Sequence, residues 1–249
     1  MGRRGFSLVE LMIAVAALGI LAALVAPAMI GAIEVAKRTA CASNLHQLGI
    51  AMHAYLRDHD GQFFPLRESE PDGVLWYFGF EPSGSPARGE GNRILDRTRA
   101  KLYPYLESPE TVEVCPSVPF GHPYKPKYRG QPWTYGINYE LSYHTGSRNI
   151  SEVRPQDASQ TVVFADSAQV VTWIPPASAQ NPMMEDWYYI RSGERTVQFR
   201  HGGRANVLFA DWHVEAIGPA PGSFDPRLPE ARIGYFDSDQ VLLVPRGGR

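Results

Sequence analysis

Few side chains in this 249-residue sequence stand at the spacing of a catalytic or metal-binding motif. Its two cysteines, Cys41 and Cys115, form no Cys-x-x-Cys or Cys/His pair with the spacing that zinc sites use, so we expect no metal site built on thiolates. Outside the cytoplasm they could form a disulfide that ties two distant segments together, worth about 4 to 5 kcal/mol in the chain-entropy model. The alternative is a pair of buried thiols.

A second candidate set, His201, Asp211 and His213, could provide metal ligands or an acid–base pair. Gly202-Gly203 predicts a hairpin turn, which places His201 near the turn and Asp211 at the far end of a strand, several residues of about 3.4 Å rise away. We therefore favour a structural role. The sequence also lacks nucleophile-elbow, phosphate-loop, dinucleotide and metalloprotease motifs, so we do not expect an enzyme.

The segment Asp58-His59-Asp60-Gly61 resembles a fragment of a calcium-binding loop. The third ligand position and the distal glutamate of such a loop are missing, so calcium is the weaker interpretation. Gly61 suits the left-handed residue that ends many helices, and we expect a helix to end here.

The net charge of −2 and the pI of about 6.4 give no general attraction to nucleic acid, which we do not expect as a partner. The residues from Leu11 to Ile33 contain no charged side chain, and a helix of this length can cross the ~30 Å hydrocarbon layer of a membrane. Arg3 and Arg4 precede this segment, which predicts a cytoplasmic N-terminus.

A cleaved secretory signal is the alternative for this segment, because Ala26-Pro27-Ala28 offers a superficial cleavage site. Two features oppose it. Pro27 and the apolar stretch that follows fit a continuing helix, and Glu10 places a carboxylate in the apolar segment, where it costs several kcal/mol in lipid unless it is paired.

The sequence Gly5-Phe6-Ser7-Leu8-Val9-Glu10-Leu11 resembles the processing site of type IV prepilins and type II secretion pseudopilins. This resemblance implies that a prepilin peptidase cuts between Gly5 and Phe6, that Phe6 is N-methylated, and that the product assembles with other pseudopilins on an inner-membrane platform. It also implies that Glu10 pairs with the Phe6 amine of a neighbouring subunit. The alternative is a carboxylate that snorkels near the helix start.

Pro27 would be the twenty-second residue of the mature chain, a position where these pilins also carry proline, and we expect it to bend the helix. Beyond Glu34 the apolar residues form one stripe, as in an amphipathic helix. A helix from Phe6 to Asp58 would be about 80 Å long, so its first half must project from any compact head. The stripe consists of Cys41, Leu45, Leu48, Met52 and Tyr55.

These patterns predict an α+β protein in which the distal half of a long helix packs on an antiparallel sheet, as in pilins. Its parts would be a leader (1–5), a membrane and polymerisation helix (6–33), an amphipathic continuation (34–60) and a head (61–249). In the head we expect a helix at 97–106 and aromatic clusters that serve as core. We expect strands at 161–165, 170–174, 196–200, 206–210 and 214–217.

The C-terminal part resembles a pseudopilin-like group with a histidine followed ten residues later by Asp-Gly, here His201 and Asp211. The similarity extends to three further segments, 41–49, 115–117 and 135–139. One departure is Trp212 in place of the glycine, so the turn must change type or hold a bulky residue at positive φ.

The expected function is that of a structural subunit of a type II secretion pseudopilus or type IV pilus-like filament. Its anchor would cross the inner membrane once, with the head in the periplasm or on an extracellular appendage. The alternative is a membrane-anchored protein whose aromatic and arginine-rich loops bind a polysaccharide. A third interpretation is a protein secreted after cleavage at Ala28.

Overall fold

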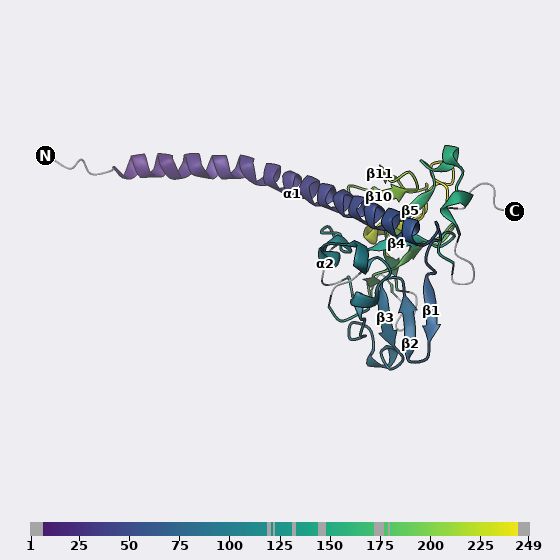
Figure 1. The fold of residues 1–249 in the computed structure, drawn as a ribbon. Helices are drawn as coiled ribbons and strands as arrows, with labels where there is room; N and C mark the ends of the chain where they lie inside the picture. Colours follow the sequence, from purple (N-terminus) through teal and green to yellow (C-terminus); the bar gives the residue numbers. More distant parts are fainter. Residues whose placement is uncertain are drawn as a thin grey trace.

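The computed structural model describes residues 7–118, 121, 123–130, 133–143, 148–171, 177–178 and 180–243. One long helix, α1 (Leu8–Asp58), runs from the N-terminus into a β-rich head, so the α+β architecture predicted from the sequence is confirmed (Figure 1). The expected cleavage site, Gly5 and Phe6, lies outside the described residues.

Helix α1 begins with a capping box. The Ser7 hydroxyl accepts a hydrogen bond from the Glu10 amide at 3.2 Å, and the Glu10 carboxylate accepts one from the Ser7 amide at 2.9 Å. Two of the amides at the helix start, which have no partner within the helix, are satisfied in this way. The helix then continues without interruption through position 27 to Asp58, close to the predicted bounds of 6 and 58.

The N-terminal half of α1 projects away from the head (Figure 1). Its most apolar 18-residue window has a mean hydropathy of 2.6, and none of it is buried against the rest of the protein. A helix satisfies its own backbone hydrogen bonds, so a segment of this length and composition can cross a membrane.

The C-terminal half of α1 packs on the head through the predicted stripe. Cys41, Leu45, Leu48 and Met52 are fully buried and Tyr55 is 7% exposed, which confirms the amphipathic pattern. At the helix end, Gly61 has a φ of +76° and its amide donates a hydrogen bond to the Leu56 carbonyl at 2.7 Å. Gly61 is therefore the left-handed terminating residue that the sequence predicted.

The main sheet has the strand order β11-β10-β5-β4-β8. Neighbouring strands are antiparallel except β4 and β8, which pair in parallel, so the sheet is mixed. Helix α1 covers β10, as the labels in Figure 1 show. The strands are β4 (Tyr135–Asn138), β5 (Val162–Asp166), β8 (Tyr189–Ile190), β10 (Ala205–Phe209) and β11 (Val214–Ile217).

The predicted hairpin around Gly202-Gly203 is wrong in its strand pairing. Both glycines have positive φ and His201 and Arg204 form a bridge across them, so the turn itself is present. However, β9 (Val197–Gln198) pairs with β12 (Ile233–Gly234) and not with β10. The chain therefore leaves one sheet and enters another at this turn.

A smaller antiparallel sheet, β1-β2-β3, was not predicted. Its strands are β1 (Arg67–Glu70), β2 (Gly73–Trp76) and β3 (Gly79–Pro82). The helix predicted at 97–106 is wrong: the segment forms two 3₁₀ turns, η2 (Arg97–Arg99) and η3 (Tyr103–Tyr105), with Pro104 inside the second. Proline has no amide hydrogen to continue an α-helix there.

The remaining elements are short. They are β6 (Gln169–Val170) paired with β7 (Met184–Glu185), α2 (Pro109–Val112), η1 (Pro86–Arg88), η4 (Ile150–Glu152), η5 (Pro155–Asp157) and η6 (Pro229–Ala231). Of the predicted strand 170–174, residues 172–174 lie outside the described residues.

The aromatic clusters of the head form core, as the sequence indicated. Tyr77, Phe78 and Tyr135 are at most 1% exposed, and Trp133 is 3% exposed. The Tyr77 ring lies edge-on to Trp133 at 5.3 Å, and the Tyr77 hydroxyl donates a hydrogen bond to the Tyr188 carbonyl at 2.6 Å. Buried aromatic rings and satisfied hydroxyls thus hold the irregular segments together.

Gly136 provides a test of the packing between β4 and β8. A Cβ at this position would lie 2.8 Å from the carbonyl carbon of Tyr189, which is a backbone atom that cannot move alone. We expect Gly136→Ala to lower the free energy of unfolding by about 1 to 3 kcal/mol in a denaturant titration of the detergent-solubilised chain.

The matched control is Gly218→Ala, because a Cβ there meets no atom within 4 Å. Its effect should stay within about 0.5 kcal/mol. Equal stability of the two variants would show that the β4–β8 contact is looser than the structure indicates.

Candidate functional site

The residues predicted to act in assembly lie on the exposed part of α1. Glu10 is solvent-exposed in the single chain and caps the first helical turn through Ser7. Pro27 lies within α1. The intersubunit ion pair of Glu10 and the bending role of Pro27 remain predictions.

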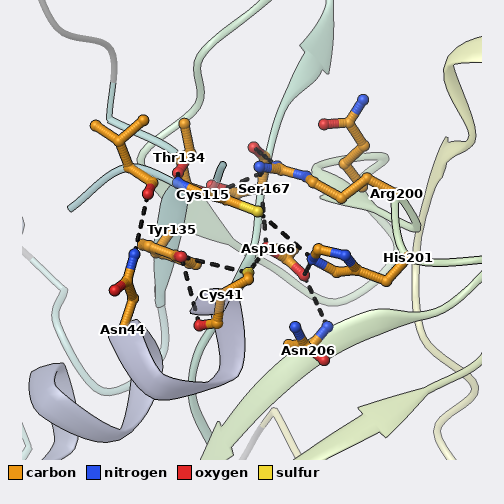
Figure 2. Close-up of polar contacts among 12 residues, drawn as sticks. Cys41, Asn44, Cys115, Thr134, Tyr135, Asp166, Ser167, Arg200, His201 and Asn206 are labelled. Carbon is orange, nitrogen blue, oxygen red and sulfur yellow. Dashed lines mark hydrogen bonds and ion pairs between the residues drawn. The ribbon is translucent and has the colours of Figure 1, made fainter. Parts of the chain in front are cut away.

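A second candidate site lies inside the head, where four buried side chains from separate segments converge (Figure 2). Cys41 comes from α1, Cys115 from the loop after α2, Asp166 from the last position of β5 and His201 from the turn after β9. Their sulfur, oxygen and nitrogen atoms all lie within 4.8 Å of one another. His201 is 5% exposed and the other three are fully buried.

The contacts within this cluster join sulfur, carboxylate and imidazole atoms. Cys41 Sγ lies 3.2 Å from Asp166 Oδ1, and Cys115 Sγ lies 3.5 Å from His201 Nε2. The same Nε2 atom lies 3.1 Å from Asp166 Oδ2. Both cysteines are free thiols in the structure, which brings the predicted disulfide partners together without a bond between them.

Neighbouring groups contact three members of the cluster (Figure 2). The Tyr135 hydroxyl donates a hydrogen bond to Cys41 Sγ at 3.3 Å, and the Asn206 amide donates one to Asp166 Oδ2 at 2.7 Å. The Cys115 amide donates to the Thr134 hydroxyl at 2.6 Å. The groups that contact the cluster therefore come from β4, from the residue before it and from β10.

Arg200 supplies a buried positive charge beside the cluster. Its side chain is 3% exposed, and its Nη1 atom lies 3.9 Å from Asp166 Oδ1. Nη2 donates to the Ser167 carbonyl at 2.6 Å. Among the described residues, Nε and Nη1 have no hydrogen-bond partner, so the guanidinium is stabilised mainly by the charges that it faces.

The electrostatics of the cluster favour charged forms of three members. Burial would raise the pKa of Asp166, but the charge of Arg200 and the hydrogen bond of His201 hold it below its usual value. Burial opposes ionisation of Cys115, but hydrogen bonds from Cys41 and His201 lower its pKa to about 5. Burial would lower the pKa of His201, but Asp166 and Cys115 raise it to about 9.

Burial has the opposite outcome at Cys41, because it raises the pKa of this thiol well above the usual value. The protonated Cys41 thiol has one hydrogen, which it can donate either to Asp166, 3.2 Å away, or to Cys115. These directions favour a thiolate at Cys115 and a carboxylate at Asp166 beside the cationic forms of His201 and Arg200.

The geometry does not match a catalytic triad. In such a triad the nucleophile and the carboxylate contact different ring nitrogens of the histidine. Here Cys115 Sγ and Asp166 Oδ2 both approach Nε2 of His201. All four side chains are also buried among the described residues.

The residue types are those that bind borderline or soft metal ions, in contrast to the expectation that the two cysteines form no metal site. Sequence spacing did not reveal this group, because its members come from four distant segments. Segments 41–49 and 115–117, which resemble the pseudopilin-like group, each contain one member of the cluster. Nothing in the sequence paired them with Asp166.

The predicted set of His201, Asp211 and His213 does not come together. Asp211 is exposed and contacts His213 Nδ1 at 2.5 Å, whereas His201 is buried and contacts Asp166. The structure therefore separates His201 from Asp211, as the sequence argument indicated, and gives His201 a partner that was missed.

At the calcium-like segment, Asp58 accepts a hydrogen bond from the Tyr105 hydroxyl at 3.3 Å and lies 3.6 Å from Nε of Arg57. Asp60 has a φ of +51° and belongs to the turn that ends α1. These contacts describe the end of a helix. Calcium binding remains a prediction, for which the segment lacks the third ligand position and the distal glutamate.

Trp212, which stands where the resembling group has glycine, is a bulky residue at positive φ. Its φ is +71°, in the left-handed region that favours glycine, and its amide donates to the Phe209 carbonyl at 2.9 Å. Its ring is half-buried and lies 5.6 Å from that of His53 on α1. Packing on α1 thus offsets the strain of the β10–β11 turn.

Two substitutions separate strain from packing at Trp212. Both Trp212→Ala and Trp212→Gly remove the ring, but only glycine relieves the positive φ. We expect Trp212→Gly to be about 1 kcal/mol more stable than Trp212→Ala in denaturant titrations. If the alanine variant were equally stable, the backbone at this turn would not be strained.

Comparisons with known proteins match two segments of the chain. Residues 1–26 match the family model of the prokaryotic N-terminal methylation motif. Residues 32–123 match the model described as a protein of unknown function (DUF1559). The curated proteins and the solved structures gave no match.

The first model covers the predicted processing site and the start of α1. The second model covers the amphipathic half of α1 and includes both Cys41 and Cys115. The chain therefore carries a prokaryotic N-terminal methylation motif followed by a DUF1559 segment, and its single N-terminal apolar helix and α+β head match the layout of a pilin-like protein.

Proposed function

We propose that the mature chain is a structural, non-enzymatic subunit of a type II secretion pseudopilus or a type IV pilus-like filament. The observation that carries this proposal is the N-terminal half of α1, which is apolar on all sides and unburied in the single chain. A soluble monomer does not leave such a surface exposed, because it must be covered by lipid or by other apolar helices.

Both coverings are available to a prepilin-like chain. Before assembly, the exposed half of α1 lies in the membrane, where its length matches the hydrocarbon layer. After processing, the same surface packs against the helices of neighbouring subunits, and the head occupies the outside of the filament. Leu8, Leu18 and Leu24 are 66 to 75% exposed and illustrate the surface available for this packing.

Glu10 supports assembly over simple anchoring. A carboxylate near the start of a lipid-embedded helix is costly unless a positive group compensates it. Cleavage after Gly5 would create an amine at Phe6, and the Phe6 amine of an adjacent subunit can provide that group. The capping contact with Ser7 leaves this role open, because a carboxylate accepts more than one hydrogen bond.

The partners implied by this proposal are a prepilin peptidase, other pilin-like subunits and an inner-membrane assembly platform. Arg3 and Arg4 favour a cytoplasmic N-terminus, which places the head in the periplasm or on an extracellular appendage.

The alternative of a tethered polysaccharide-binding protein depended on exposed aromatic loops. The aromatic residues of those segments, including Tyr77, Phe78 and Trp133, are buried in the core. Their inward positions remove the main argument for ligand capture and favour the filament proposal.

Substitutions of Glu10 test the ion pair apart from the helix cap. Glu10→Gln keeps an oxygen that accepts from the Ser7 amide but removes the charge, whereas Glu10→Asp keeps the charge. We expect the processed Gln variant to enter sheared fibres at least about ten-fold less than wild type, with the Asp variant between them. Fibre and membrane fractions would be compared by quantitative immunoblot.

Glu34→Gln is the matched control on the same helix, because this exposed carboxylate contacts only Lys37, at 3.4 Å, among the described residues. It should assemble normally. Normal assembly of Glu10→Gln would mean that Glu10 acts as a helix cap and not through its charge.

The mature N-terminus separates a processed pilin from a secreted protein. Mass spectrometry of the chain from membranes should find N-methylated Phe6 as the first residue. A chain that begins at residue 29 would instead support cleavage at Ala28 and would contradict the filament proposal.

A further inference from the structure

We propose that Cys41, Cys115, Asp166 and His201 form a zinc site that fastens the long helix to the head. This inference concerns the head alone and does not depend on filament assembly. It follows from the geometry of the cluster, its charge and the groups that surround it.

The spacing of the four ligand atoms fits a tetrahedral ion. With bonds of about 2.3 Å to sulfur and about 2.0 Å to nitrogen and oxygen, neighbouring ligand atoms of a zinc tetrahedron lie about 3.3 to 3.8 Å apart. The observed separations are 3.1 Å (His201 to Asp166), 3.2 Å (Cys41 to Asp166) and 3.5 Å (Cys115 to His201). The two shorter separations fall up to about 0.2 Å below the tetrahedral range, and all four ligand atoms lie within 4.8 Å of one another.

The contacts at His201 favour an ion over a proton. An imidazole nitrogen carries one hydrogen or one lone pair, whether the ring is neutral or charged, yet Nε2 faces both a sulfur and a carboxylate oxygen. A proton on Nε2 can form a well-aligned hydrogen bond with only one of them. A cation bound to the Nε2 lone pair can also bind the sulfur and the oxygen.

A divalent ion is compatible with the charges of the cluster. Two thiolates and one carboxylate contribute three negative charges, and zinc leaves one of them uncompensated. Arg200 provides the missing positive charge, since its buried Nη1 lies 3.9 Å from Asp166 Oδ1. This account also gives a reason for burying a guanidinium whose Nε and Nη1 have no hydrogen-bond partner among the described residues.

The surroundings have the features of a metal site's outer shell, in which hydrogen bonds orient the ligands. Tyr135 donates to Cys41 Sγ and the Asn206 amide donates to Asp166. The combination of two sulfurs, one nitrogen and one oxygen selects zinc over calcium or magnesium, which prefer oxygen ligands.

A disulfide between Cys41 and Cys115 is the competing use of the two sulfurs. It would leave Asp166 and His201 directed at uncharged sulfur, so it accounts for only half of the cluster. The metal accounts for all four side chains.

The position of the site indicates what it does. Cys41 is the first fully buried residue of α1 among those described, at the point where the helix enters the head. Zinc there would join α1 to β5 and to the turn after β9, so that force along the helix passes into the main sheet.

The test begins with the full-length chain, extracted from membranes in detergent without chelators. Elemental analysis should find about one zinc per chain. After zinc removal and addition of cobalt(II), the absorption spectrum should show thiolate-to-cobalt charge transfer and the strong visible bands of a tetrahedral ion. Mass spectrometry after alkylation of the denatured, non-reduced chain should find two alkylated cysteines.

Three variants locate the site, and zinc titration of each measures its affinity. Cys115→Ser and His201→Gln should each lose stoichiometric zinc and the cobalt spectrum. Tyr135→Phe, which removes a hydrogen bond to a ligand and no ligand, should weaken zinc binding about 10- to 100-fold. His213→Gln is the control, because this exposed histidine contacts Asp211 away from the cluster, and it should bind zinc as wild type does.

Circular dichroism identifies variants that fail to fold, and the wild-type cobalt spectrum keeps the proposal testable without them. A Cys41–Cys115 disulfide in the membrane-extracted chain would overturn the proposal. So would a wild-type chain that binds no zinc and gives no thiolate–cobalt band, or a His213→Gln variant that loses zinc as fully as His201→Gln.

Discussion

Helix α1 must satisfy two environments with one unbroken backbone. Its first half has no protein surface to cover it, and its second half forms part of a globular core. In lipid each backbone amide and carbonyl needs a partner within the segment, so a break in the exposed half would be costly, whereas a helix meets this demand by itself. Because the helix is unbroken between its exposed half and its buried half, it fixes the direction in which the head projects from the exposed half.

The head is arranged around the stripe that begins at Cys41. Strand β10 lies against α1, and a Cβ at Gly49 would approach the Leu208 side chain to 3.0 Å. The same contact region brings β5 close to the helix, which places Asp166 beside Cys41. The buried cluster is thus a consequence of how the helix docks on the sheet, and a metal there would strengthen the joint between the two.

Two features in the head show how packing overrides local preference. Trp212 has a positive φ, which glycine would adopt with less strain, and its ring packs against the ring of His53 on α1. The irregular segments 71–143 contain many prolines and glycines and few long elements. Their buried aromatic rings supply the apolar contacts that longer strands would otherwise provide.

The sequence by itself determined the features that depend on near neighbours along the chain. The apolar run, the stripe from Cys41 to Tyr55 and the stop at Gly61 follow from residue spacing and backbone preference. Strands β5, β10 and β11 follow from short runs rich in apolar residues. Only the tertiary structure decided which strands pair. It also decided that Cys41, Cys115, Asp166 and His201 meet in one place, because those contacts depend on long-range packing energy that no local pattern records.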